Sequence, residues 1–411
     1  MSNLIPIGPH VKLRQGLAIN RGSAHLVSDK KDEEFCVPLL RIADMMDGTF
    51  STYISKYAPS NVFAKKGDIV YTRTGQIGLV FNQYEGCVHN NSFVVELQDD
   101  VFDKDYLIVA LKSSFVRDQA LNKAMSSVQP DLTHDMFKNI LIPFFKKDIQ
   151  KKIAKQYNSI DEKIKNNSKI ITELESMAKT LYDYWFLQFE FPNENGKPYK
   201  SSGGKMVYNK ELKREIPESW KVENMMESSL CSDIKAGVEK FESKNYLPTA
   251  NIEGESITDG EYVTFDNREN RANMQPVKYS VWFAKMKNSI KHLSIPENSE
   301  WFINKYILST GFQGLKCTKT SFAYIHSIIN SSWFETYKDI LSHGATQEGV
   351  NNEDLKNIKY VVPSYNVLIE FNKICMPALE KKFSIIRENQ ELVSLRDFLL
   401  PMLMNGQVTF K

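Results

Sequence analysis

The chain has 411 residues, of which 42% are apolar and 25% charged, a composition typical of two or three globular domains. Its 52 Lys and Arg against 50 Asp and Glu leave a net charge of +2, which argues against a polybasic binder. Nucleic acid is not excluded, because a local basic face matters more than the sum. No apolar run approaches the ~18–20 residues of a membrane span. The five scattered Cys lack a CxxC pair, which favours reduced thiols in the cytoplasm over a disulfide framework or a zinc ribbon.

Residues 1–146 combine strand and helix patterns. Lys66-Gly67-Asp68 is a turn signal that leads into a strand, and Gly75 and Gly78 bracket a second tight turn. The segment is therefore predicted to be a globular α+β domain. Its expected strands are 37–42, 68–72 and 93–97, and its expected helix is 106–111.

A long helix is predicted from Asp148 to about Leu187. Its apolar residues alternate steps of three and four between charged flanks, which is a heptad-like seam. Asn167 lies in that seam, where a polar residue can fix the register of a partner helix. At 1.5 Å per residue, such a helix spans roughly 55 Å.

A second globular segment and a second helix follow a loop. Gly, Pro, Ser and Asn dominate 192–204, and the loop is expected to cover 189–215. Residues 216–364 are again predicted to be α+β, with strands 246–251, 281–286 and 307–310 and a helix 322–329. A helical pattern then occupies about 367–403, with Pro377 expected near its start or at a kink.

The chain repeats itself. Lys138-Asn-Ile140 and Lys356-Asn-Ile358 lie 218 positions apart, as do Gln129 and Gln347. Each triplet precedes an apolar run that ends in Pro and then a long helix, which predicts two copies of one unit. The narrow seams favour packing of the two helices on each other, and the alternative is that each helix packs on its own globular segment. The predicted interface consists of Ile153, Ile160, Ile164, Ile171, Leu174, Leu181, Leu379, Phe383, Ile386, Leu392 and Leu399.

The usual catalytic motifs are missing from the sequence. It has no GxxxxGK[ST] phosphate loop, no HExxH, no GxSxG and no methyltransferase tetrapeptide of the Asn-Pro-Pro-aromatic type. A loose nuclease-like set, Asp131, Asp161 and Lys163, leaves metal-dependent cleavage as an open alternative. The charged flank of a helix explains Asp161 and Lys163 more simply, and no metal site or catalytic residue is predicted.

Polar, turn-rich segments with Arg, Lys, Asn and Gln remain as candidate DNA contacts. Arg can bond guanine bidentately, Asn and Gln can bond adenine, and Lys attracts phosphates. Solvated surface loops are the alternative interpretation. The candidates in the first half are Arg14, Arg21, Lys30, Arg41, Arg73, Thr74, Gln76, Asn90, Asn91, Ser127 and Gln129. Those in the second half are Lys235, Lys240, Lys244, Arg268, Arg271, Asn273, Lys285, Lys287, Lys291, Gln313 and Gln347.

Two parts of the sequence are distinctive: 174–189, continuing through 196–204 to 215–220, and the C-terminal stretch 395–406. They resemble one known family, the DNA-specificity subunits of type I restriction–modification systems. Lys66-Gly-Asp-Ile-Val-Tyr71 resembles the family's Gly-Asp-Ile strand. The second half departs from this pattern, because 279–285 replaces Gly-Asp-Ile. The two halves are therefore expected to read different sequences.

The resemblance implies an α+β fold with two target-recognition domains, 1–146 and 216–364, separated by an antiparallel two-helix coiled coil. The helices would be the central conserved region, 147–188, and the C-terminal region, 365–411. The chain itself would be non-catalytic and bind no cofactor. It would read a split, asymmetric site in double-stranded DNA, and its helices would set the spacer between the two halves.

The resemblance also implies partner subunits. The chain would dock two methyltransferase subunits that use S-adenosylmethionine and two motor–nuclease subunits that use ATP and Mg²⁺. A fused methyltransferase–nuclease as partner remains an alternative, and so does a coiled-coil scaffold that does not bind DNA.

Overall fold

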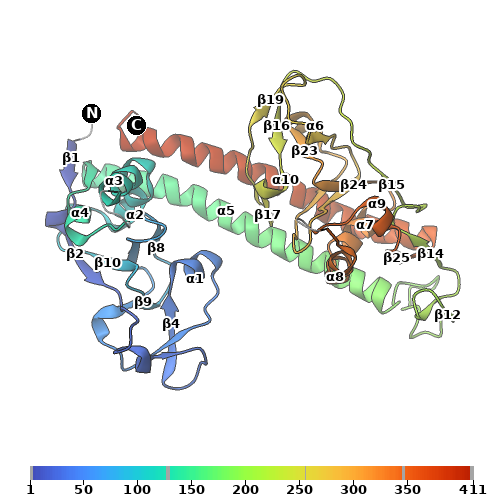
Figure 1. Cartoon of the computed structure of the whole chain (residues 1–411), viewed down its shortest axis with the longest axis horizontal. Coiled ribbons are helices and arrows are strands. Elements are labelled where there is room, and N and C mark those ends of the chain that lie inside the picture. Colours follow the sequence, from blue (N-terminus) through green and yellow to red (C-terminus); the bar gives the residue numbers. More distant parts are fainter. Residues whose placement is uncertain (1–2, 126–129, 255, 345–347, 408–411) are drawn as a thin grey trace. The chain divides into compact units, whose positions relative to one another are not determined.

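The computed structural model describes residues 3–125, 130–254, 256–344 and 348–407. They form two compact units: unit 1 comprises Met1–Lys163 and Leu392–Lys411, and unit 2 comprises Ile164–Glu391. Figure 1 labels their elements. Within the described ranges no helix is long and apolar enough to cross a membrane.

Unit 1 contains two sheets. The first is antiparallel, in the order β2 (Val11–Gln15), β10 (Ser92–Leu97), β7 (Ile69–Thr72), β8 (Val80–Phe81). The second has the order β3 (Val27–Ser28), β5 (Tyr53–Ser55), β4 (Phe35–Leu40), β9 (Gly86–Val88), β6 (Phe63–Ala64), with β4 and β9 parallel. β1 (Asn3–Pro6) pairs with β11 (Leu141–Phe144). The short helices are α1 (Ile42–Asp47), α2 (Lys104–Lys112), α3 (Ser114–Ala124) and α4 (His134–Lys138).

Unit 2 repeats this architecture. Its first sheet has the order β15 (Cys231–Asp233), β24 (Phe312–Cys317), β21 (Ser280–Ala284), β22 (His292–Ile295). Its second has the order β19 (Tyr262–Val263), β16 (Lys244–Leu247), β23 (Tyr306–Ser309), β20 (Ala272–Met274), with β16 and β23 parallel. β14 (Lys221–Asn224) pairs with β25 (Lys359–Val362). The helices are α6 (Glu300–Lys305), α7 (Phe322–Ile329), α8 (Ser332–Leu341) and α9 (Asn352–Leu355).

The offset of 218 positions extends to whole elements. β1 and β14, α2 and α7, α3 and α8, and β11 and β25 all start at residues 218 apart. Their caps repeat as well, because Ser113 caps α3 and Ser331 caps α8 through the side-chain oxygen. An N-cap of this kind stabilises a helix by about 1 kcal/mol. The units differ in the segments between, where unit 1 adds β3 and unit 2 adds α6 and the hairpin of β17 (Ile252–Glu253) and β18 (Ser256–Ile257).

The core of unit 1 combines residues from its N-terminal and its C-terminal chain segment. Tyr71, Phe93 and Phe137 form mutual ring contacts with centroids 4.8–5.7 Å apart. The same core contains Leu403 and Met404, and the Tyr106 hydroxyl lies 3.9 Å from the Met404 sulfur. Residues near 400 therefore complete a core whose other members lie before residue 158.

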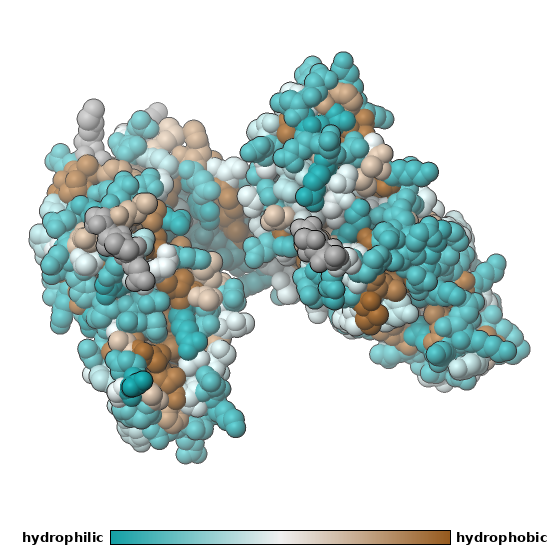
Figure 2. Space-filling model, viewed as in Figure 1, coloured by the Kyte–Doolittle hydropathy of each residue, from teal (hydrophilic) through white to brown (hydrophobic). Residues whose placement is uncertain are grey.

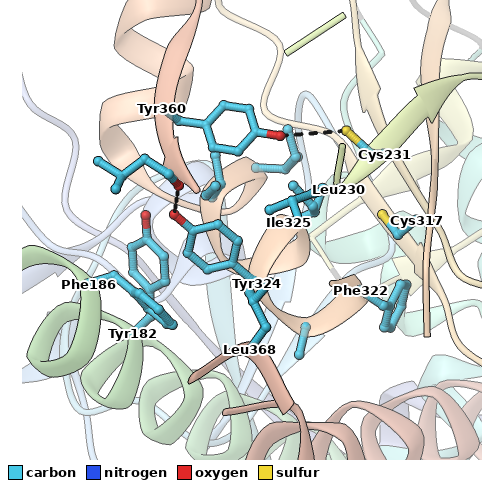
Figure 3. Close-up of a cluster of buried hydrophobic side chains, with 14 of the residues drawn as sticks. Tyr182, Phe186, Leu230, Cys231, Cys317, Phe322, Tyr324, Ile325, Tyr360 and Leu368 are labelled. Carbon is cyan, nitrogen blue, oxygen red and sulfur yellow. Dashed lines mark hydrogen bonds between the residues drawn. The ribbon is translucent and has the colours of Figure 1, made fainter. Parts of the chain in front are cut away.

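The core of unit 2 is rich in aromatic side chains (Figure 3). Phe186 contacts Tyr324 and Phe371 with ring centroids 4.6 and 4.8 Å apart. Tyr182 packs beside them, and the Tyr324 hydroxyl donates to the carbonyl of Val361. A π-helical turn, Asp183–Leu187, ends the long helix here, and both Trp185 and Phe186 are buried in it.

The two long helices, α5 (Lys147–Tyr182) and α10 (Tyr365–Met404), each contribute to both units. In unit 1, Asp161 lies 3.6 Å from Arg396. In unit 2, the Asn167 amide donates to Glu388 and Asn389 at 2.9 and 2.8 Å.

The helix contacts in unit 2 are antiparallel. Ile171 packs with Ile385 and Ile386, and Lys382 pairs with Glu175, so positions that rise along α5 meet positions that fall along α10.

The helices thus contact each other and also their globular segments. Both kinds of packing considered from the sequence therefore occur in this structure. Of the predicted interface residues, Ile171 and Ile386 meet between the helices, and Leu174 packs against them. Leu379 and Phe383 belong to globular clusters of unit 2, and Ile153 to the core of unit 1. Ile160 is buried, whereas Ile164, Leu181, Leu392 and Leu399 are half-buried.

Several predicted boundaries were wrong. The strand expected over 37–42 ends at Leu40, because α1 begins at Ile42. The strand expected over 246–251 ends at Leu247, since Pro248 lacks the N–H that a ladder needs. Of the two places expected for Pro377, the helix start is wrong, because Pro377 lies inside α10, while a kink there stays a prediction. The segment 189–215, expected to be a loop, contains strand β12 (Met206–Asn209) and the start of its partner β13 (Arg214–Pro217).

Gly314 of β24 offers a test of the unit 2 core. A Cβ there would lie 2.4 Å from the ring of Trp282, which is fully buried. Gly314→Ala is expected to lower the free energy of unfolding by about 1–3 kcal/mol, because the core has no room for a methyl group. Urea denaturation measures this, with Gly22→Ala as control, where the nearest atom is a side-chain oxygen at 3.3 Å. Equal midpoints for the two variants would contradict the prediction.

Candidate nucleic-acid interface

In unit 1, loops from both sheets meet at one end. We call Gln15–Leu17, Arg73–Gly78, His89–Asn91 and Asp131 loop cluster 1. The Arg73 amide donates to the carbonyl of Asn91 at 2.8 Å, and the Asn90 amide donates to that of Leu17 at 3.0 Å. These backbone bonds fix the loops that follow β2 and β7 against the loop that precedes β10.

Arg73 is the centre of loop cluster 1. Its Nε and Nη2 donate to the two carboxylate oxygens of Asp131 at 2.9 and 2.5 Å, and its Nη1 donates to Gln15 Oε1 at 3.2 Å. The Arg73 and Asp131 side chains remain 20% and 35% exposed. A bidentate pair of this kind holds the planar guanidinium in one orientation.

Loop cluster 1 contains His89, and His134 lies near its Arg73 and Asp131. Burial, and then the charge of Arg41, lower the pKa of His89. Burial, and then the charge of Arg73, lower the pKa of His134. Both imidazoles are therefore neutral at neutral pH.

Unit 2 has an equivalent group of loops, which we call loop cluster 2: Asp233–Gly237, Arg271–Asn273, Lys285–Lys287 and Thr310–Gln313. The Lys285 amide donates to the carbonyl of Gly311 at 2.9 Å, and the Thr310 amide donates to that of Arg271 at 2.8 Å. The Asp233 carboxylate accepts from Gln313 at 2.5 Å and from Asn352 at 3.1 Å. The pKa of Lys285 lies below its ordinary value. Burial is the main cause, and the charge of Arg271 lowers the pKa further, whereas the charge of Asp233 raises it.

The structure brings only some of the predicted DNA contacts of the first half together. Loop cluster 1 contains Arg73, Thr74, Gln76, Asn90 and Asn91, and the exposed Arg41, which directly precedes α1, lies near His89 of this cluster. Arg21 and Lys30 are exposed on other loops. The structure binds Arg14 elsewhere, to Glu96 at 2.6 Å and to the carbonyl of Phe63 at 3.0 Å. Ser127 and Gln129 lie outside the described residues.

The predicted contacts of the second half are divided in the same way. Loop cluster 2 contains Lys235, Arg271, Asn273, Lys285, Lys287 and the buried Gln313. Lys240, Lys244 and Arg268 surround a separate ring pair, Phe241–Phe265. Lys291 donates to the carbonyl of Ile252, and Lys287 pairs with Glu348 at 2.7 Å. Gln347 lies outside the described residues.

Sequence reasoning did not single out Gln15 and Asp233, which help to shape the two clusters. They lie 218 positions apart, so an alignment of the two copies would have placed them together. Asp131 was considered only as a nuclease carboxylate. In the structure it pairs with Arg73, whereas Asp161 lies beside Arg396. The described part of the chain holds no group of three His, Cys, Asp or Glu side chains suited to a metal ion.

Known proteins resemble this chain along most of its length. Residues 12–176 match the family model of the type I restriction modification DNA specificity domain. The MjaIX specificity subunit of Methanocaldococcus jannaschii is 23% identical over 352 residues, which are 84% of this chain and 78% of that protein. The HindI specificity subunit of Haemophilus influenzae is 21% identical over 405 residues, covering 84% of this chain and 87% of the relative.

A solved structure supports the fold. The S subunit of a type I restriction–modification system from M. genitalium aligns with a TM-score of 0.58 at 15% identity, over all of this chain and 96% of that one.

Proposed function

Because the chain belongs to the specificity subunits of type I restriction–modification systems, we propose that it reads a bipartite, asymmetric site in double-stranded DNA, one half through each unit. The observation that carries this proposal is the pair of loop clusters. They occupy equivalent places in two copies of one framework but present different side chains: Arg73, Asn90 and Asn91 in unit 1, and Arg271 and Lys285 in unit 2. Different side chains at equivalent places favour two different half-sites.

We further propose that α5 and α10 form an antiparallel two-helix coiled coil that sets the unspecified spacer. The antiparallel contacts of Asn167 and Ile171 in unit 2 support this. The lengths of the helices, 36 and 40 residues, support it too, because 36 residues correspond to about 54 Å and one turn of DNA is about 34–36 Å.

Partner subunits would supply the chemistry. Figure 2 shows apolar patches on a mostly hydrophilic surface. Met177 on α5 and Leu395 on α10 lie 218 positions apart, and they are 67% and 44% exposed. Exposed apolar residues at equivalent places favour docking of two copies of one partner. We propose that these are methyltransferase subunits that use S-adenosylmethionine, joined by two motor–nuclease subunits that use ATP and Mg²⁺. The chain itself would bind no cofactor and catalyse nothing.

Exchange of one half tests the proposal. Replacing residues 1–146 by the corresponding half of another specificity subunit is expected to change one half of the methylated sequence and leave the other unaltered. Methylome mapping in cells that carry the native or hybrid gene measures this. A change in both halves or in neither would contradict the two-reader model. A complex without site-specific DNA binding would favour the coiled-coil scaffold.

A further inference from the structure

The Arg73–Asp131 pair of loop cluster 1 carries the hydrogen-bonding pattern of one particular base pair. Resting on the function proposed above, we infer that unit 1 reads a G·C pair in the major groove through Arg73 and Asp131, with Gln15 as a positioning residue. Arg is the side chain that bonds guanine O6 and N7 bidentately, and a carboxylate accepts from the amino group of cytosine.

The geometry leaves the required donors in place. A guanidinium has five N–H donors in a rigid fork. Asp131 takes the Nε donor and one on Nη2, and Gln15 takes one on Nη1. One N–H on each terminal nitrogen remains beyond these three bonds, and two such donors match the two acceptors of guanine.

The charges favour a base edge over a phosphate. Asp131 lies 2.5 Å from the Arg73 Nη2 and is 35% exposed, so its negative charge offsets that of the guanidinium and repels a phosphate. The same carboxylate is an acceptor beside the donors of Arg73. A G·C pair presents acceptors on guanine and a donor on cytosine. It is therefore complementary to the donors of Arg73 and to the acceptor of Asp131.

Loop cluster 1 is also organised before DNA arrives. Two carboxylate bonds and the Gln15 bond hold the Arg73 side chain, and the Leu132 amide donates to the Arg73 carbonyl at 3.0 Å. The turn that follows uses Gly75 at φ +71°, a conformation that favours glycine. Because the Arg73 side chain is already held in one orientation, it loses little conformational entropy when it binds a base.

Unit 2 lacks this device. The residue that follows β21, as Arg73 follows β7, is Lys285, whose charge interacts with the carboxylate of Asp233. An ammonium is a point charge without a planar fork and cannot bond guanine in the same bidentate way. Among the residues that the structure describes, the place after β21 therefore holds no G·C reader of this type.

The test uses the full chain reconstituted with its methyltransferase subunits and a DNA library randomised in both half-sites. The half read by unit 1, identified by the exchange of residues 1–146, is expected to contain a G·C pair. Arg73→Lys should lower discrimination at that pair by about 5- to 150-fold, the range of one lost bidentate contact, and leave the other half-site unchanged. Asp131→Asn should lower discrimination at the same pair.

Asp99→Asn is the matched control, because it breaks the 2.6 Å pair with His10 at the opposite end of the same sheet. It should leave all base preferences unaltered. The inference is overturned if the half-site read by unit 1 holds no G·C pair. It is also overturned if the complex containing Arg73→Lys methylates DNA with the base preferences of the wild type. Should Arg73→Lys be inactive, the preferences of Asp131→Asn decide. If the wild-type complex showed no base preference in either half-site, that result would instead refute the proposed function.

Discussion

Lys338→Met is expected to lower the free energy of unfolding of unit 2 by about 3–5 kcal/mol, the usual cost of removing one partner from a buried ion pair. Lys338 is fully buried and lies 2.7 Å from Glu335. It also donates to the carbonyls of Ala284 and Ser289, at 3.3 and 3.1 Å. Burial raises the pKa of Glu335, but hydrogen bonds from His292 and Lys338 outweigh it, and the net pKa lies below the ordinary value. The variant would therefore leave a buried carboxylate with only His292.

The intrinsic fluorescence of tryptophan measures this effect, since all five Trp of the chain lie between residues 185 and 333, within unit 2. The matched control is Lys319→Met, which removes the exposed pair with Glu297 at 3.1 Å. An exposed pair contributes less than about 1 kcal/mol, so the control should unfold near the wild-type denaturant concentration. Similar losses in both variants would show that the burial of Lys338 does not matter.

Acid is expected to destabilise unit 2 through His326. Burial, and then the charge of Lys382, lower the pKa of His326 from 6.5 to about 3. Its ring nitrogen Nδ1 lies 2.6 Å from the Ser294 hydroxyl and 3.2 Å from the Asn330 amide. Below pH 6.5 the unfolded chain binds a proton at this residue that the folded chain does not. The contribution of His326 to the free energy of unfolding is therefore fully present above pH 6.5. It falls by about 1.4 kcal/mol per pH unit towards pH 3.

The contribution of His326 is isolated by comparison with His326→Gln. Urea midpoints followed by tryptophan fluorescence between pH 7 and pH 4.5 should fall less steeply for the variant than for the wild type. His25→Gln is the control, because His25 is exposed on a short 3-10 helix of unit 1, Ala24–Leu26. Parallel slopes for wild type and His326→Gln would mean that His326 takes up its proton in the folded state.

The helices of the framework could be predicted because their signals are local. The helix expected over 322–329 is α7 to the residue, and the long helices begin within two residues of their predicted starts. Apolar periodicity and cap residues lie within the element itself. The hairpin β12–β13 was missed, because its neighbours are rich in Gly, Ser and Lys and its pairing joins residues across a turn at Lys213 with φ +52°.

The residue types of the candidate site could be predicted, but not their partners. Arg14 and Arg73 look alike in sequence, since Arg14 lies near the end of a strand and Arg73 directly follows one. The structure pairs Arg14 with Glu96, 82 positions away, and Arg73 with Asp131, 58 positions away. Only the fold brings such residues together, so residue type alone does not tell a loop contact from a strand contact.

The discontinuity of unit 1 has a consequence for synthesis on the ribosome. Unit 2 is one continuous stretch, and all of its residues have been made once Glu391 is added. The core of unit 1 needs Leu400, Leu403 and Met404, which follow only after the whole of unit 2. Since domains generally fold as their residues emerge, the N-terminal segment must wait with part of its apolar surface uncovered while unit 2 is translated. The order of completion along this chain is therefore the reverse of the order of synthesis, and the nascent N-terminal segment is the one that needs protection from aggregation.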